Sequence, residues 1–342
     1  MNQMNNSFIK HLLITLIIFS NYSFGKEFGE LFTIYVPIEN TSEIESSINQ
    51  SFNNLVFRIS GSKSPSNIWK IINSGSSRKD FISSYSIKNI NNKSYLEVNF
   101  NQNLVIDKFK KLSIPIIGYS RPVIFFLINV ESGSEDPYFI SKDSTNDIDI
   151  YIKESLDRLS NERGLFLELP VLDLEDETFL TNTSILNSPQ QYLISKYDFD
   201  EYVDIKLINL GLKKWLIKGD INTDFNKESY LEDIKQSLDN YLESLINTTF
   251  SDLKIDTSKT ILLEVNIEGI YSYEDYEILK EKLLKNIAIT NLEILNLKND
   301  TITYKINAMG DINNFKKSIE NNTFFEFLSE KTENNLSLRF LK

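Results

Sequence analysis

Apolar positions along the chain follow two different periods, and these periods predict where its strands and helices lie. Residues 31–38 form a short run rich in β-branched and aromatic side chains, which is typical of a strand. Apolar residues then recur every three or four positions over 42–59, which predicts a helix that ends at Gly61. The other elements expected in this first region are a short helix over 65–72, strands over 81–90 and 94–100, a helix over 102–112 and a strand over 123–130. With the short extra helix set aside, the order β-α-β-β-α-β is the split β-α-β, or ferredoxin-like, pattern.

A polar stretch over 131–148 contains Gly133 and Pro137 and predicts a loop or linker. After it, the pattern of residues 150–163 is that of an amphipathic helix, which Gly164 ends. The elements expected next are strands over 165–171, 202–210 and 214–221 and a long helix over 230–246. This middle region therefore predicts an α/β unit.

The last third of the chain repeats the order of the first region without repeating its residues. Its expected elements are a strand over 261–267, a helix over 272–284, strands over 287–295 and 302–308, a helix over 312–319 and a strand over 336–341. We therefore expect an α+β protein of two or three small mixed-sheet modules, with ferredoxin-like patterns at both ends. The expected modules are an N-terminal α+β module over 26–131, a central α/β module over 149–252 and a C-terminal ferredoxin-like module over 259–342.

The first 25 residues have the pattern of a secretory signal peptide. Lys10 precedes an apolar run over 12–19, and Ser23 and Gly25 provide the small residues that a signal peptidase needs. The run is about half of the ~20 residues that span a bilayer, so the pattern favours a cleaved signal over a retained anchor. We therefore expect a periplasmic protein without a stable membrane span, and not a lipoprotein, because the chain has no cysteine.

Composition excludes several classes of function. Asp and Glu number 48 against 36 Lys and Arg, giving a net charge of −12, which disfavours binding to nucleic acids and to anionic lipids. The absence of cysteine excludes thiolate metal sites and cysteine nucleophiles. His11 is the one histidine and lies in the predicted signal peptide, so the mature chain would lack Ser-His-Asp triads. The sequence also has no glycine-rich phosphate-binding motif. We expect no catalytic residues, no cofactor and no metal.

The densest charged feature is the acidic run over 173–177, which supplies Asp173, Glu175 and Asp176 as candidate binding residues. Carboxylates of this kind could hold calcium, but the run lacks the spacing and the glycine of an EF-hand loop. The alternative that the pattern favours is a turn whose acids cap the next helix, since negative charge is favourable at a helix N-terminus.

Arg121 and Trp215 are the other candidate binding residues. Arg121 precedes a predicted strand, where a guanidinium can clamp a carboxylate or a phosphate. It can equally form a structural ion pair with Asp173 or Glu175, which is the interpretation we favour. Trp215 could line a ligand or glycan groove, although most aromatic residues in strands belong to the core.

Paired carboxylates can also hydrolyse glycans without a histidine. Asp173, Glu175, Asp198 and Asp200 are candidates for such a pair by their position in the sequence alone. A carboxylate-dependent cell-wall glycan hydrolase or glycan-binding protein is therefore the alternative function. It requires two of these acids in one cleft, within about 5–10 Å of each other.

Several short motifs follow one another in a set order and spacing from about residue 31 onward: Arg58-Ile59-Ser60-Gly61, Gly118, Arg121-Pro122, Glu162-Arg163-Gly164-Leu165, Pro170, Asp173-Leu174-Glu175-Asp176, Tyr197, Asp200 and Trp215. In this order and spacing the chain resembles an uncharacterised proteobacterial family, domain of unknown function 2066. Ile117 departs from the family pattern, which tends to place tryptophan there. The resemblance implies an exported protein and supplies no catalytic residues. We therefore expect a non-enzymatic binding or scaffolding protein of the Gram-negative envelope, with an envelope protein as its partner.

Overall fold

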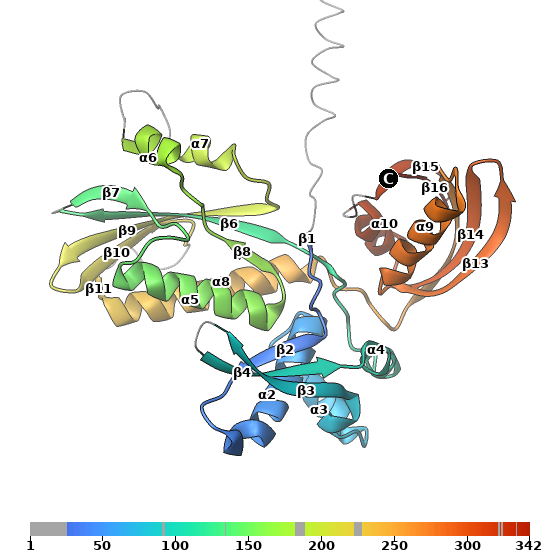
Figure 1. Ribbon diagram of the computed structural model, residues 1–342, viewed down its shortest axis with the longest axis horizontal. Coiled ribbons are helices and arrows are strands. Elements are labelled where there is room, and N and C mark those ends of the chain that lie inside the picture. Colours follow the sequence, from blue (N-terminus) through green and yellow to red (C-terminus); the bar gives the residue numbers. More distant parts are fainter. Residues whose placement is uncertain are drawn as a thin grey trace, which may run out of the picture.

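The computed structural model describes residues 26–90, 93–133, 135–181, 189–221, 228–320, 322, 324–332 and 334–342. The predicted signal peptide lies outside these residues. No helix in the described part of the chain is both long and apolar enough to cross a membrane. The expected α+β class is confirmed, because helices pack against several small mixed sheets (Figure 1).

The N-terminal module is built on a three-stranded antiparallel sheet with the order β2-β4-β3. Its strands are β2 (Thr33–Pro37), β3 (Ile82–Ile90) and β4 (Lys93–Phe100), and its helices are α2 (Ile44–Ser60), α3 (Ser66–Asn73) and α4 (Gln102–Lys111). Helix α2 ends where the sequence predicts, because Gly61 takes the left-handed conformation that closes a helix, with φ at 62°. A short ribbon of β1 (Lys26–Glu27) and β5 (Ser120–Arg121) joins this module to the next.

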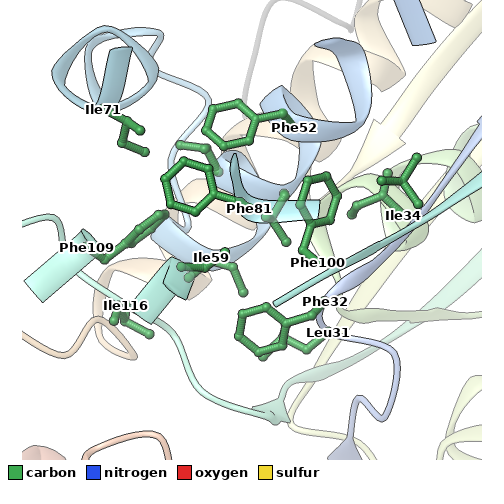
Figure 2. Packing of buried hydrophobic residues seen from close by; sticks show 14 of the residues in the cluster. Leu31, Phe32, Ile34, Phe52, Ile59, Ile71, Phe81, Phe100, Phe109 and Ile116 are labelled. Atoms are coloured by element: carbon green, nitrogen blue, oxygen red, sulfur yellow. The ribbon is translucent and has the colours of Figure 1, made fainter. Parts of the chain in front are cut away.

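The core of this module combines aliphatic side chains with a group of phenylalanines (Figure 2). Phe52 of α2 stacks on Phe81 with ring centroids 5.5 Å apart, and Phe100 of β4 lies 6.4 Å from Phe52. Phe109 of α4 and Ile116 complete the same buried cluster. Each such side chain contributes about 1.5–3 kcal/mol by leaving water, so this cluster fixes the helices onto the sheet.

The strand predicted over 123–130 does not complete the N-terminal sheet. It is β6 (Val123–Ser132), and it lies inside the central sheet, whose order is β11-β10-β9-β6-β7 with β8 also paired to β6. The physical reason is that both faces of β6 are apolar. Ile124, Phe126 and Ile128 enter one core, whereas Phe125 and Leu127 enter another. A strand of this kind belongs in a sheet that is covered on both sides.

The other strands of the central sheet are β7 (Glu135–Phe139), β8 (Phe166–Glu168), β9 (Glu201–Gly211), β10 (Lys214–Gly219) and β11 (Ser229–Tyr230). Strand β9 runs parallel to β6, as does β8. Strand β7 pairs antiparallel with the end of β6, so part of the stretch predicted as a loop over 131–148 is a hairpin. The pattern missed β7 because a polar edge strand with a proline has no clear apolar period.

Helices cover both faces of the central sheet (Figure 1). Helices α5 (Asp147–Arg163) and α8 (Leu231–Ser251) pack on one face, and α6 (Leu174–Thr181) and α7 (Pro189–Ile194) lie on the other. Gly164 ends α5 in the left-handed conformation, as the sequence predicts.

The C-terminal module has a five-stranded sheet with the order β13-β14-β12-β16-β15. Its elements are β12 (Thr260–Glu268), α9 (Tyr273–Lys285), β13 (Ile289–Lys298), β14 (Thr301–Met309), α10 (Ile312–Glu320), β15 (Phe325–Thr332) and β16 (Asn335–Phe340). The split β-α-β arrangement is present, because β14 lies between β12 and β13. The apolar pattern of the sequence did not predict β15. Because this extra strand precedes β16, the last strand joins β12 in the parallel sense, whereas a ferredoxin-like sheet is antiparallel throughout.

The C-terminal module also packs against the N-terminal one. Ile116 and Ile255 form an antiparallel bridge, and the Thr257 hydroxyl donates to the Ile114 carbonyl at 2.9 Å. Ala288 and Met309 belong to the same buried cluster as the N-terminal core. The segments between the modules are therefore held in place by packing and hydrogen bonds.

Candidate functional site: a cleft beside a buried arginine cluster

A cleft of about 500 Å³ opens where the three modules meet. One wall is the β1–β5 ribbon with residues 117–119, and another is formed by the ends of α9 and α10. Ile117, Val123, Leu253, Ile255 and Ile287 supply its apolar surface. A volume of this size and an apolar floor are typical of a ligand site.

Apart from Lys26 and Glu27 of the β1–β5 ribbon, the charges that line the cleft separate by module. Glu168, Asp198 and Asp252 come from the central module and its exit segment. The lysines of the C-terminal module are in the last turns of α9 and α10, and they are Lys282, Lys285 and Lys317. The cleft therefore presents an acidic side and a basic side.

Some of these charges are neutralised within the protein. Lys26 pairs with Glu168 at 2.9 Å, and Lys285 lies 3.9 Å from Glu27. Neither Lys317 nor Asp198 forms an ion pair with any residue that the structure describes. These two exposed charges of opposite sign remain available to a ligand.

The hydroxyl of Ser120 adds a neutral polar group to the lining. Its oxygen is buried and has no hydrogen-bond partner in the described part of the chain. A buried hydroxyl normally has a partner, so this oxygen can donate to or accept from a bound group.

Arg121 lies directly behind the cleft wall and has no exposed surface. Its Nε donates to the Gly118 carbonyl at 2.7 Å and its Nη2 to the Ile117 carbonyl at 3.0 Å. Arg121 therefore holds the backbone of the wall from within and does not face a ligand. It does not form the ion pair predicted with Asp173 or Glu175, because its donors are taken by carbonyl groups.

Two helix ends supply the other acceptors of Arg121. Its guanidinium donates to the Arg58 carbonyl at the end of α2, at 3.2 Å, and to the Arg163 carbonyl at the end of α5, at 3.4 Å. Carbonyl groups at a helix C-terminus have no partner within the helix and carry partial negative charge, so they favour a cation. The buried guanidinium of Arg121 is thus held by carbonyl groups of two helix ends and of the cleft wall.

Arg58 and Arg163 connect the same two helix ends by hydrogen bonds in both directions. Arg58 of α2 donates to the Asn161 carbonyl on α5, and Arg163 of α5 donates to the Gly61 carbonyl beyond α2 at 3.4 Å. Arg163 also pairs with Glu243 of α8 at 2.8 Å. We call Arg58, Arg121 and Arg163 the arginine joint, because they connect the N-terminal and central modules.

Burial lowers the pKa of Arg121 to about 9, and the like charges of Arg58 and Arg163 act in the same direction. Burial also lowers the pKa of Arg58 to about 10. These two guanidinium groups therefore remain charged at neutral pH, and burial also lowers the pKa of Arg163. The ring of Phe250 faces Arg121 and Arg163, with its centroid 5.4 Å from the Arg121 guanidinium and 5.6 Å from that of Arg163.

The acidic run caps α6, which confirms the capping interpretation. Asp173 accepts from the Asp176 N–H at 2.8 Å, and Asp176 accepts from the Asp173 N–H at 3.1 Å. Asp176 is buried and also accepts from the Tyr192 hydroxyl at 2.8 Å and from Lys196 at 2.5 Å. Burial opposes ionisation of Asp176, but these hydrogen bonds outweigh it and lower its pKa. Glu175 is exposed on the same helix.

The remaining predicted residues lie apart from one another. Trp215 is buried in the core of the central module, which is the default interpretation given above. Asp200 accepts from the Val123 N–H at 2.7 Å, and burial raises its pKa against that hydrogen bond. Of the acids considered for hydrolysis, Asp198 lines the cleft, whereas Asp173, Glu175 and Asp200 are not among the lining residues. No group of three or more Asp, Glu, His or Cys residues in the described part of the chain is placed to hold a metal ion.

The lysines of the cleft were not predicted. Lys282, Lys285 and Lys317 stand in the last turns of two helices, where basic residues are ordinarily explained by the helix dipole. The one signal in the sequence is that both predicted helices of the last module end in lysines. Nothing in the sequence indicates that these ends face the central module.

No family model, curated protein or solved structure matches the chain. The resemblance to domain of unknown function 2066 therefore rests on the quoted residues alone. Several of these residues, which are far apart in the sequence, meet at the arginine joint: Arg58, Gly61, Gly118, Arg121, Arg163 and Gly164.

Proposed function

We propose that this chain is a periplasmic binding or scaffolding protein of the Gram-negative envelope, which holds a segment of a partner protein in the cleft. The observation that carries this proposal is the pair of exposed charges, Lys317 and Asp198, that face one apolar-floored cleft from different modules without partners among the described residues. Apolar clefts into which a few polar groups converge are the usual ligand-binding sites of proteins.

A polypeptide segment suits this lining better than a polyanion does. The acidic side, with Asp198 and Asp252, repels phosphate or carboxylate polymers, and the basic side, with Lys317, repels polycations. A segment that carries both charge signs and an apolar side chain complements both sides and the floor. Complementary charges contribute mainly to the specificity and the rate of such an association.

The proposed location follows from the first 25 residues, whose charge, apolar run and small residues fit a secretory signal. Mass spectrometry of the protein from a periplasmic fraction tests it. We expect an N-terminus at Lys26, whereas an intact Met1 terminus would contradict cleavage.

The hydrolase alternative receives less support from the geometry. Asp173 and Asp176 cap a helix, and Asp200 binds a backbone N–H, so these acids already have structural partners. Asp198 is the candidate that lines the cleft. We therefore keep the binding function as the conclusion.

Photo-crosslinking in cells tests the proposal. A crosslinking amino acid at Lys317, on the cleft wall, should capture the same envelope protein in replicate purifications. The matched control is Lys218 on β10, which is also exposed but does not line the cleft. We expect Lys317→Glu to lower recovery of that protein about tenfold and Lys218→Glu to leave it unchanged. If position 317 captures no reproducible partner, or if both reversals act alike, the proposal is contradicted.

A further inference from the structure

Strand β13 forms an open edge of the C-terminal sheet, since β14 is its one neighbour among the strands that the structure describes (Figure 1). Its second half is apolar and exposed: Ile294 is 47% exposed, Leu295 50% and Leu297 66%. Exposed edges of this kind are normally shortened, charged or covered, because their unpaired backbone groups bind other strands. This edge has charges and bulges, which can protect an edge strand, but it also keeps an apolar stretch exposed.

A β-bulge decides which side chains of β13 share a face. The register with β14 shifts between Ile294 and Asn296, so Leu295 is the extra residue. Ile294 lies opposite Tyr304 and Leu297 opposite Ile302, and both of those partners are buried beneath the helices. Ile294 and Leu297 consequently lie on the helix-covered face of the sheet, because residues directly opposite each other share a face.

The charged residues of this segment lie on the other face. Glu293 is opposite Lys305, and Lys298 is opposite Thr301. Without the bulge, Glu293 and Lys298 would point to opposite faces, because they are an odd number of positions apart. Neither forms an ion pair with any residue that the structure describes.

These faces make residues 293–298 complementary to themselves in an antiparallel arrangement. When Glu293 lies opposite Lys298 of a second copy, Ile294 lies opposite Leu297 of that copy. The two-fold axis repeats each pair, so the register contains two Glu–Lys pairs on one face and two Ile–Leu pairs on the other. Both kinds of cross-strand pair are favourable, and these four residues of each copy stay on the faces that the bulge gives them.

We propose that β13 is a homodimer interface at which two copies pair antiparallel, with Glu293 of each opposite Lys298 of the other. This joins two five-stranded sheets into one continuous sheet across the dimer. Residues 293–298 do not line the cleft, so the dimer leaves that site open. The charge complementarity of the register identifies the occupant of the edge as a second copy of this chain.

Sedimentation velocity over a range of micromolar concentrations tests the proposal. We expect the wild-type mass to approach twice that of the monomer as the concentration rises. Leu297→Lys should raise the dimer dissociation constant at least tenfold, because it places a charge in the apolar pair. Leu212→Lys is the matched control, since Leu212 is 92% exposed on a turn of the central module. A wild-type chain that stays monomeric, or a Leu297→Lys variant that dimerises like the control, overturns the proposal.

Charge exchange tests the register itself. Glu293→Lys and Lys298→Glu each create two like-charged pairs across the two-fold axis, so each should weaken the dimer about tenfold. The double variant restores opposite charges and should dimerise like the wild type. Lys305 lies opposite a lysine at position 293 both in Glu293→Lys and in the double variant, so the difference between these two variants reports the pair with position 298. A double variant as weak as the singles would overturn this register.

Discussion

The arginine joint makes a quantitative prediction about Arg121. Arg121→Met keeps a long flexible side chain but removes every donor from a position with no exposed surface. The carbonyls of Ile117, Gly118, Arg58 and Arg163 then lose the guanidinium that they share. We therefore expect both the connection between the modules and the cleft wall to weaken.

The magnitude follows from the number of acceptors. A buried polar group that loses its partner costs about 1–3 kcal/mol. We take the lower end, because removing a buried cation from beside Arg58 and Arg163 also relieves desolvation and like-charge repulsion. With four carbonyls affected, the free energy of unfolding should fall by about 4 kcal/mol.

Urea denaturation followed by tryptophan fluorescence is the assay, and the chain suits it. The two tryptophans are Trp69 in α3 and Trp215 in β10, so the signal comes from the modules that Arg121 connects. Arg158→Met is the control, since Arg158 is a half-exposed arginine that pairs with Asp239 at 3.3 Å and with Glu162 at 3.8 Å. Exposed ion pairs contribute about 0–1 kcal/mol, so the control should change little.

A small effect at Arg121 would refute the reasoning. If Arg121→Met and Arg158→Met lower the free energy of unfolding equally, the carbonyls of the joint do not depend on the guanidinium. A loss of about 4 kcal/mol in Arg121→Met alone supports the joint.

Two further substitutions test the central module. Gly219→Ala should destabilise the protein far more than Gly211→Ala in denaturant titrations. Both glycines have positive φ, so both substitutions strain the backbone. A Cβ at Gly219 would also collide with the Asp204 carbonyl, whereas a Cβ at Gly211 would face open space. Equal losses would contradict this. Asp176→Asn should cost about 1.5–3 kcal/mol at pH 7, because the hydrogen bond from Lys196 has an ionised acceptor. Because the folded-state pKa of Asp176 is lowered, its carboxylate stabilises the fold above pH ~4, and this stabilisation disappears as the pH falls through the folded-state pKa. The free energies of unfolding of the wild type and of Asp176→Asn should therefore converge in acid. A difference between them that stays constant with pH would contradict this.

The sequence predicted the elements of the fold better than their partners. The helix ends at Gly61 and Gly164 follow from local chemistry, as does the cap formed by Asp173 and Asp176. The pattern also predicted a strand at β6 but assigned it to the first sheet. Its continuous apolar run indicates that both faces of the strand are buried, but an apolar segment does not show which strands pair with it.

Of the residues that the sequence singled out, Asp198 lines the cleft, whereas Arg121 lies behind its wall. Arg121 does not form the predicted ion pair, because its acceptors are backbone carbonyls, including those of two helix ends. The cleft lysines were not identified, because Lys282 and Lys317 line a cleft only once the C-terminal module packs beside the other modules. Sequence position carries no information about which surfaces face each other.

The sequence by itself determined the α+β class and the positions of most helices and strands. It did so because periodicity, helix caps and composition are local properties that each segment carries with it. The tertiary structure alone decided that β6 joins the central sheet, that three arginines meet at two helix ends, and that a charged cleft opens between the modules. These features depend on contacts between residues far apart in the chain, and packing and desolvation fix such contacts only when the modules come together.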